Sequence, residues 1–467
     1  MEFIDYIVFG IYFFGVLAVG IYFYRQNQNR EDYFIGSRNI GASHIGMSIV
    51  ATDVGGGFSI GLGGLGFVMG IAGTWLLFTG LIGAWISAII IVPKIKKIDK
   101  ANNMMTFPDF LRYSYNDKVA LLAAIISGIG YLGFTGAQIL AGAKLAAGSI
   151  FSSIDSVNPL DLSLYLMGII VIIYTALGGI KAVIYTDTIQ WNILLIGLMV
   201  FGVPASISSI GGVSNLFDSL PSEYFSFTNI TIIQFVNWMF TIIPIWFIAM
   251  TLYQRIYAAK NVKEAKKAFF IAGLLEYPIM AFLGVILGMI AKIHFPDVNS
   301  EMGMPLLLTE VLPIGITGII VAAFFSAIMS TADSCLIASS GNFLNDVIER
   351  YILKNLSHKK VVVLSQITTF VIGTFAIILA QSFETVLEII LHAYSFMVAG
   401  LLVPTLIAYF SKHKNSKSAI YSMLGGGIIT LVLIFSKIKM PFGFDPSIYG
   451  ILVSGLVYYL SYKIIRE

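Results

Sequence analysis

One face of an apolar segment is rich in side-chain hydroxyl groups and forms a candidate cation site. A spacing of i, i+3, i+4 and i+7 places four residues on this helical face: Ala327, Ser330, Thr331 and Ser334. Hydroxyl and carbonyl oxygens are hard ligands, which suit an alkali cation better than a transition metal. The chain has a single cysteine, Cys335, and no cluster of histidine and cysteine. By spacing alone, the alternative that the hydroxyls of Ser330 and Thr331 only bond to their own helix and aid packing is favoured over a cation site.

A second candidate site lies where an apolar segment is interrupted by three glycines. The segment reads Ala51-Thr52-Asp53-Val54 and continues with Gly55-Gly56-Gly57. Lipid cannot satisfy the backbone groups that such a break frees, so the break must line a cavity or bind a ligand. Asp53 adds an ionisable group at membrane depth, where acids mark functional sites. We expect the carbonyls freed at this break to meet the hydroxyls of the first site.

Other side chains within apolar segments are candidates for binding an organic solute. They are Asp53, Phe58, Ser59, Gln138, Trp246, Glu388, His392 and Tyr394. Glu388 and His392 are four residues apart and either face the pocket or pair with each other. Glu276 is a further intramembrane acid, for which structural and gating roles both stay open. Lys144 is expected to extend its ammonium group to the outer interface.

The composition indicates an all-α polytopic membrane protein. Hydrophobic residues make up 57% of the 467 residues, charged residues only 11%, and the mean hydropathy is +0.88. A soluble domain carries about 25% charged residues. Hydropathy predicts about 13 transmembrane helices, near 4–24, 43–70, 73–93, 119–150, 160–178, 181–205, 230–255, 267–293, 305–345, 359–381, 384–411, 417–436 and 445–465. The stretches 119–150 and 305–345 exceed one crossing, and each is expected to begin with a short interfacial helix.

Lysine and arginine predict the orientation. Alternate loops hold 24 of the 28 basic residues, including Arg25, Arg30, Lys181 and Lys354, whereas the opposite loops hold only Lys292, Lys437 and Lys439. Cytoplasmic loops carry this excess. We therefore expect a multi-pass protein of the cell membrane with its N-terminus outside and its C-terminus in the cytoplasm. The first segment reads as a retained helix because Glu2 and Asp5 precede it in place of a basic region. The net charge of +3 follows from these loops and requires no nucleic-acid partner.

Two interrupted helices at matching positions predict an internal repeat. The second span breaks at Gly55, and the seventh carries Pro244, which lacks an N–H and disturbs the preceding turn. They begin two five-span blocks, 43–205 and 230–411. Interrupted helices in corresponding positions of two halves indicate a transporter binding site. The predicted organisation is a single transporter domain, 1–467, with an extra helix at 4–24 and two C-terminal helices at 417–465.

Three motifs resemble the sodium/solute symporter family. The run Met329-Ser330-Thr331-Ala332-Asp333-Ser334, followed by Leu336 and Ser339-Ser340, closely resembles its signature. So do Gly178-Gly179-Ile180-Lys181-Ala182-Val183 with Thr186-Asp187 and Gln190, and Gln254-Arg255 at the end of the seventh span. The resemblance covers essentially the whole chain. It implies a leucine-transporter-like fold with a five-plus-five inverted repeat.

The resemblance also implies two cation sites. The common sodium site of the family would use the carbonyls of Ala51, Val54 and Ala327 with the hydroxyls of Ser330 and Thr331. Some members hold a second sodium ion, and its ligands would match Asp187, Ser330 and Ser334. Asp333 stands where those members have a hydroxyl. It either strengthens the second site with a carboxylate or replaces sodium with a proton or a salt-bridge partner.

Further comparison with family members narrows the range of candidate solutes. Asp53 lies in a stretch that resembles the proline transporters, in which the acid supports sodium binding. The glycines that follow resemble the choline transporters, but those have a tryptophan where Asp53 stands, which argues against choline. Trp246 matches an aromatic residue of the sugar transporters, yet Ile245 replaces their tyrosine gate. Asp53 would serve the sodium ion or pair with a substrate amine.

The sequence therefore predicts a sodium-coupled secondary active symporter that imports a small organic solute by alternating access. An amino acid or related zwitterion is favoured; a carboxylate, a sugar or a quaternary amine is the alternative. A cation channel would need a continuous polar pore, and a transporter-like sensor would need a signalling domain. No nucleophile or metal motif indicates an enzyme. The expected partners are sodium, the solute and the lipid bilayer, with no nucleic acid and no obligate protein partner.

Overall fold

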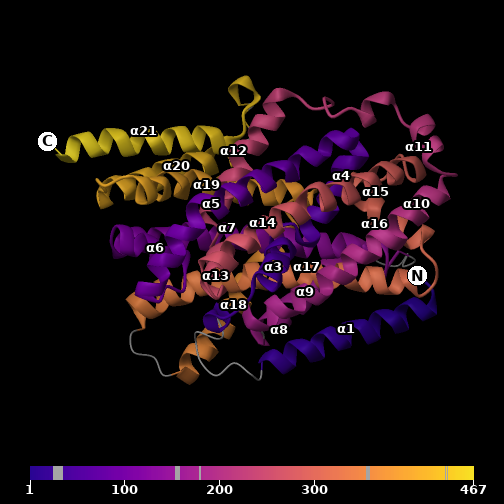
Figure 1. The fold of residues 1–467 in the computed structure, drawn as a ribbon, viewed down its shortest axis with the longest axis horizontal. Coiled ribbons are helices and arrows are strands. Elements are labelled where there is room, and N and C mark those ends of the chain that lie inside the picture. The colour runs from indigo at the N-terminus through magenta and orange to yellow at the C-terminus, as the bar shows by residue number, and fades with distance from the viewer. Residues whose placement is uncertain are drawn as a thin grey trace.

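The computed structural model describes residues 1–24, 35–152, 158–177, 180–353, 358–436, 438 and 440–466, and these are overwhelmingly helical. The β-type pairing in the described ranges is limited to an isolated bridge between Ile40 and Ala259. The long helices lie side by side in one bundle, and the two termini lie at opposite ends of it (Figure 1). Of the predicted features, Gly178, Gly179, Arg25, Arg30, Lys354, Lys437, Lys439 and the side chain of Lys181 lie outside the described residues.

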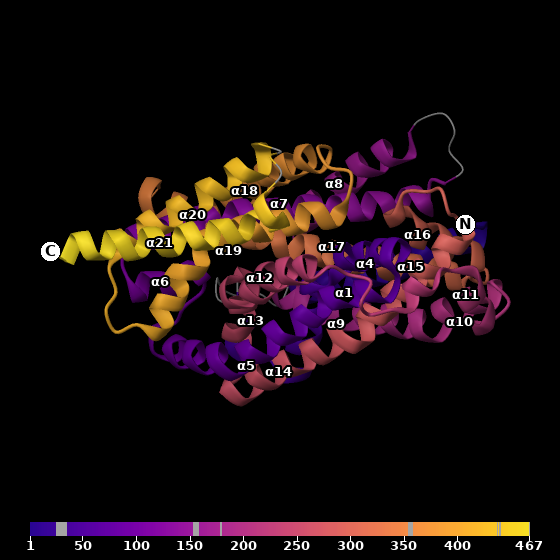
Figure 2. The same cartoon turned by 90° about the horizontal axis from the view of Figure 1, so that it is seen from above.

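The α-helices begin and end as follows: α1 Phe3–Tyr24, α3 Ala42–Asp53, α4 Gly55–Met69, α5 Trp75–Asn102, α6 Phe107–Ser114, α7 Asp117–Gly148, α8 Pro159–Leu177, α9 Ile180–Gly197, α10 Val203–Ser209, α11 Val213–Ser219, α12 Ile232–Ile248, α13 Met250–Ala258, α14 Val262–Leu274, α15 Ala281–His294, α16 Ser300–Val311, α17 Ile316–Gly341, α18 His358–Ala380, α19 Val386–Phe410, α20 Ser416–Ser436 and α21 Pro446–Arg466. Three π-helical segments continue long helices: η3 Leu198–Gly202, η5 Leu275–Met280 and η6 Asn342–Ile352. Helices α20 and α21 run together along one edge of the bundle (Figure 2).

Among the described residues, nine helices are long and apolar enough to cross a membrane, or ten when the bent pair α12 and α13 counts as one span. This measure joins α4 and α5 into one stretch, and it finds only shorter apolar helices in α1 and α8. The protein is therefore a multi-pass membrane protein, and the number of thirteen crossings stays a prediction. The stretch 305–345 divides into α16 and α17 as expected. Residues 119–148 of the other stretch belong to the single continuous helix α7, so the expectation of a separate short helix there was wrong.

The second span breaks where the glycines predicted. Helix α3 ends at Asp53 and α4 begins at Gly55, whose φ of +44° suits glycine. A Cβ atom at Gly55 would also lie 2.3 Å from the hydroxyl oxygen of Thr331 in α17. The glycine therefore permits both the turn of the backbone and the close approach of the two helices.

The seventh span breaks at a different residue from the one expected. Pro244 lies inside α12, and the interruption falls at Ala249, whose ψ of 118° separates α12 from α13 at a bend of 42°. A proline removes one hydrogen bond and kinks a helix without having to end it. In the first turn of α13, the backbone N–H of Thr251 has no partner within its own helix and donates to the Tyr131 hydroxyl of α7 at 3.2 Å.

Helices α4 and α15 approach each other through glycines. A Cβ atom added to Gly288 would lie 2.0 Å from the carbonyl oxygen of Gly63, and one added to Gly66 would lie 2.2 Å from that of Val285. Backbone therefore packs against backbone along this interface, as is typical of small residues between membrane helices. The contact holds α15 in a defined position relative to the break at Gly55.

Candidate functional site

The hydroxyl groups of α17 meet the carbonyl oxygen freed at the break. Thr331 donates to the carbonyl of Ala51 at 2.7 Å, and the same hydroxyl oxygen lies 3.0 Å from the carbonyl of Ala327. Ser330 also donates to Ala327, at 3.1 Å. Four of the five predicted sodium ligands are thus gathered where α3 contacts α17. The carbonyl of Val54 accepts from the N–H of Phe58 at 3.0 Å, within the first turn of α4.

This oxygen set fits an alkali cation. All its atoms are hydroxyl or carbonyl oxygens, and they come from two helices whose separation sets the size of the site. The described residues contain no group of three or more histidine, cysteine, aspartate or glutamate side chains arranged to hold a metal ion. Sodium would be cargo here, held by neutral oxygens at the contact between α3 and α17.

The predicted second cation site is built around an arginine. Arg255 of α13 is fully buried, and its Nη2 atom lies 3.2 Å from Ser334 Oγ and 3.7 Å from a carboxylate oxygen of Asp187. Ser48 of α3 donates to the same carboxylate oxygen at 2.5 Å and accepts from Arg255 Nε at 3.1 Å. Thr52 also accepts from the guanidinium. We call Arg255, Asp187, Ser48, Thr52 and Ser334 the arginine cluster.

Asp333 faces away from the arginine cluster. One of its carboxylate oxygens accepts from the hydroxyl of Thr175 in α8, and the other has no partner. Asp333 is adjacent to Ser334, but successive residues of a helix point about 100° apart, so the two side chains serve different neighbours. The four residues proposed for a second cation therefore do not converge on one point in this conformation.

Several of the predicted solute residues surround the break. Asp53 is only half-buried although it lies deep in the bundle, and the Tyr394 hydroxyl of α19 donates to it at 3.4 Å. The Phe58 ring lies 6.2 Å from the Tyr394 ring, between centroids. Gln138 of α7 accepts from the N–H of Gly57 at 3.0 Å. Ser59 donates to the carbonyl of Gly55 at 2.6 Å, so its hydroxyl is used within α4.

Trp246 and Glu276 lie against one glycine face of α5. A Cβ atom at Gly83 would lie 2.4 Å from the Trp246 indole, and one at Gly80 would lie 2.6 Å from a carboxylate oxygen of Glu276. Both side chains are buried, and within the part of the chain that the structure describes neither the indole N–H nor either oxygen of Glu276 has a hydrogen-bond partner. The sequence left the role of Glu276 open between structure and gating. In the structure, this acid lies next to Tyr277, where the helix is irregular.

Glu388 does not belong to this group. It is exposed in the first turn of α19, where Thr385 caps the helix and a negative charge suits the helix N-terminus. His392, one turn further along, is half-buried, and its ring lies 5.9 Å from the Phe383 ring. The placement of Glu388 in the solute pocket was wrong because α19 begins at Val386, which leaves this residue at the end of the bundle.

Lys144 was expected to extend its ammonium group to the outer interface, but its side chain is buried. Its ammonium group pairs with Glu301 of α16 at 2.5 Å and donates to the carbonyl of Glu384 at 2.6 Å. Glu301 in turn accepts from the N–H groups of Val386 and Leu387 at the start of α19. A buried pair of this kind is held by the additional hydrogen bonds that satisfy both charges. It ties α7, α16 and α19 together at the end of the bundle away from the arginine cluster.

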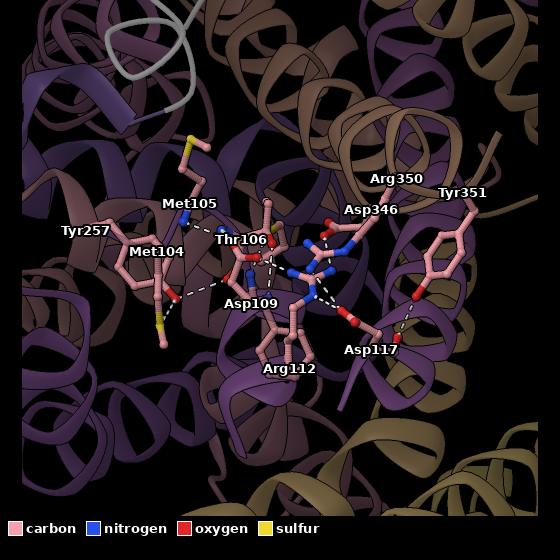
Figure 3. Close-up of polar contacts among 12 residues, drawn as sticks. Met104, Met105, Thr106, Asp109, Arg112, Asp117, Tyr257, Asp346, Arg350 and Tyr351 are labelled. Carbon is pink, nitrogen blue, oxygen red and sulfur yellow. Dashed lines mark hydrogen bonds and ion pairs between the residues drawn. The ribbon is translucent and has the colours of Figure 1, made fainter. Parts of the chain in front are cut away.

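A charged network joins the end of η6 to the elbow between α6 and α7 (Figure 3). Arg112 pairs with Asp109, with Asp117 at 2.9 Å and with Asp346 at 3.0 Å. Arg350 pairs with Asp117 at 2.9 Å. A cavity of about 280 Å³ lies beside the network, lined by Met105, Thr106, Asp109, Asn345, Asp346, Glu349 and Arg350. Because its carboxylates are shared with two arginines, we interpret this network as a brace between helices.

Comparison with known proteins identifies the family of the chain. Residues 33–426 match the sodium:solute symporter family. A sodium/glucose cotransporter of Vibrio parahaemolyticus is 28% identical over 98% of this chain and 90% of its own. A high-affinity proline transporter of Bacillus subtilis is 26% identical over 89% of each chain. A sodium/proline symporter of Escherichia coli is 25% identical over 91% of this chain and 87% of its own.

Solved structures share the fold. A Na⁺-coupled sialic acid symporter in a substrate-bound outward-open state superposes with a TM-score of 0.79 at 21% identity, over 99% of this chain and 98% of that one. A nucleobase-cation-symport-1 family transporter in a closed conformation gives a TM-score of 0.59 at 14% identity, over 94% and 96%. The family match covers most of the chain. The protein therefore belongs to the sodium:solute symporter family, and it is a sodium-coupled transporter of small organic solutes, not an enzyme.

Proposed function

We propose that the protein imports an amino acid or a related zwitterion together with sodium, by alternating access. The observation that carries this proposal is the bridge from Thr331 to Ala51, which joins α17 to α3 at the break. The relatives that transport proline support the solute class, and so does Asp53, an acid beside the first N–H groups of α4. An amine would pair with the acid, and a carboxylate would accept from the helix N-terminus.

Sodium would act by favouring one conformation. A cation held by Ala51, Ala327, Ser330 and Thr331 contacts both α3 and α17, so it binds more tightly when these helices are close together. A ligand shifts a conformational equilibrium only through such a difference in affinity. The closed contact also sets the position of Asp53 and Phe58. Sodium binding would thereby preform the solute site, which is the physical basis of coupling.

The alternatives make different demands on the site. A carboxylate solute would need a free cationic side chain, whereas each buried lysine or arginine of the described residues already has an acidic partner. A sugar or a quaternary amine would not need Asp53 to be charged. Uptake into proteoliposomes, measured with an inward sodium gradient and with potassium as the control, tests the class. Saturable uptake of proline-like zwitterions that requires sodium is expected, and uptake that is indifferent to sodium contradicts the proposal.

We further propose that the N-terminus is outside, that the C-terminus is cytoplasmic and that 43–205 and 230–411 form inverted repeats. The basic residues support the orientation, and the interruptions at Val54 and Ala249, each in the first span of a block, support the repeat. Because Cys335 is buried, a thiol reagent should react only with cysteines introduced at exposed positions, and such cysteines can show which side of the membrane each position faces. In intact cells a membrane-impermeant thiol reagent should label Glu2→Cys but not Lys412→Cys. Labelling of Lys412→Cys alone would reverse the orientation.

A further inference from the structure

Glu276 is an acid whose charge no side chain of the described residues balances. Its side chain is fully buried, and neither carboxylate oxygen has a hydrogen-bond partner among them. Burying an ionised carboxylate without a partner is costly, so such a group must bind a proton or face a cationic ligand. An acid within a membrane protein that lacks a protein partner indicates a ligand or ion pathway.

Glu276 lies at the depth of the break. Leu62 of α4 contacts Gly284 of α15, because a Cβ atom on that glycine would lie 2.8 Å from Leu62 Cβ. The spans α3–α4 and α14–α15 run in the same direction through the bundle (Figure 1). Counting back from this contact at 1.5 Å per residue reaches Gly55 after about 10 Å and Glu276 after about 12 Å. The two positions are therefore level along the bundle.

The surroundings of Glu276 are those of the solute residues. At the same depth, the Tyr394 hydroxyl donates to Asp53 at 3.4 Å. Gly80 and Gly83 are three residues apart on α5 and face Glu276 and Trp246 respectively, so these two side chains are neighbours along one helix face. Glu276 thus lies beside Trp246 and at the same depth as Asp53.

The charges near the break do not sum to zero with a zwitterion. The buried basic side chains of the described residues are Lys96, Lys144 and Arg255, and they pair with Asp99, Glu301 and Asp187. Asp333, a further buried acid without a basic partner among the described residues, accepts from Thr175 of α8 and is not counted with the residues around the break. Around the break, Asp53 and Glu276 contribute two negative charges against one sodium ion. A zwitterion leaves one negative charge buried, whereas a solute with one net positive charge leaves none. A binding site whose charges sum to zero costs less free energy to enclose in the apolar bundle than one with a net charge.

We propose that Glu276 is the counter-ion for a cationic group of the solute, an ammonium or a guanidinium, so that the preferred solute carries a net positive charge. A diamino acid and a linear alkyl diamine share this chemistry. The inference rests on the proposed function and narrows its solute class. It assigns to Glu276 the recognition of the second cationic group, while Asp53 serves the sodium ion or the α-amine.

Matched probes test this inference on the purified full-length protein. Binding is measured by calorimetry with and without sodium for lysine and for norleucine, which lacks the terminal ammonium. The diamine cadaverine and pentylamine form a second pair. We expect the probe with the additional ammonium to bind about tenfold to a hundredfold more tightly in each pair, since a hydrogen bond to a charged group contributes about 1.5–3 kcal/mol. Equal affinities within both pairs would overturn the inference.

Variants then assign the effect to Glu276. Glu276→Gln retains the shape and removes the charge, so it should abolish the preference for lysine over norleucine. Gly80→Ala keeps the charge but places a methyl group where the carboxylate lies, and it should reduce the same preference. Glu223→Gln, at an exposed acid, is the control and should behave as wild type. Unchanged preference in Glu276→Gln, with the protein still monodisperse, would overturn the assignment.

The remaining outcomes separate this inference from the proposed function. Sodium-dependent binding of proline or norleucine that is as tight as that of lysine supports symport of zwitterions and overturns the role of Glu276. If that binding also takes up a proton from a weakly buffered solution, Glu276 carries the proton. Binding of lysine that needs Glu276 but not sodium supports this inference and contradicts sodium coupling at the site.

Discussion

The arginine cluster and the residues around the break are two polar regions of one membrane core, and they differ in where the positive charge comes from. Arg255 supplies a cation from the chain itself, and its neighbours supply acceptors for it. At the break, Asp53, Glu276 and the Thr331–Ala51 oxygens have no basic side chain among their described contacts.

This difference distinguishes a structural charge from a functional one. A buried charge that is paired and hydrogen-bonded maintains a defined arrangement of helices and gives little net stability. Unmatched oxygens at the same depth remain available to ligands that come and go. We therefore expect variants of the arginine cluster to affect folding and conformational switching, and variants at the break to affect ligand affinities.

The largest effect should follow from Arg255→Met. Removal of the guanidinium leaves the Asp187 carboxylate buried without its ion-pair partner, which costs about 3–5 kcal/mol. Thermal unfolding in detergent should show a strongly destabilised protein. The double variant Arg255→Met/Asp187→Asn should recover much of the loss, because both charges are then absent. A single variant as stable as wild type would mean that the arginine cluster is not a structural pair.

Asp53→Asn should weaken solute binding about tenfold to a hundredfold, as expected when a charged partner becomes neutral. A sodium titration then separates its two possible roles. Recovery of solute affinity at high sodium assigns Asp53 to the cation, whereas an unrecovered loss that spares amine-free analogues assigns it to the amine. Wild-type binding under every condition would exclude both roles and would contradict the assignment of ligand binding to the residues around the break.

Thr331→Ala and Ser330→Ala should raise the sodium concentration for half-maximal uptake about tenfold, because each removes one oxygen ligand worth about 1 kcal/mol or slightly more. Ser340→Ala on the same helix is the control, since its hydroxyl bonds only to Ile337 within α17. Folding should be little changed in all three. An unchanged sodium dependence in both site variants would show that sodium binds elsewhere.

The smallest effect on uptake is expected for Asp187→Asn. The guanidinium of Arg255 keeps its neutral acceptors Ser48, Thr52 and Ser334 but loses its counter-charge, so thermal unfolding should show part of the destabilisation expected for Arg255→Met. The change should appear in the Hill slope for sodium or in the pH profile of uptake, measured in proteoliposomes. If both match wild type, Asp187 acts only as the ion-pair partner of Arg255.

The parts of the site that depend on one helix were predictable from the sequence. The hydroxyl face of α17 and the glycine break at Gly55 follow from local spacing and from backbone conformation. Their meeting was expected because the freed carbonyls need partners, and Thr331 does contact Ala51. The family and the sodium-coupled activity were also predicted, since the motifs that indicate them are continuous in the chain.

The parts that depend on contacts between distant helices were not predictable. Lys144 pairs with Glu301, which follows it by 157 residues, and no local sequence pattern predicts that pair. Arg255 was recognised only as the end of a motif, because its partners come from α3, α9 and α17. Pro244 drew attention as the break, although Ala249 is the residue with the extended backbone. Sequence patterns indicate which face is polar, but not which partner from another helix meets it.

The close contact between α4 and α15 has a mechanical consequence for the transport cycle. Where Gly63 and Gly288 bring backbone against backbone, a shift of one helix along the other by a residue would drive side chains such as Leu62 into the neighbouring backbone. We therefore expect the two helices to tilt together during transport, with Glu276, five residues before α15, moving together with Gly55. A solute held between them would keep the same surroundings from one side of the membrane to the other.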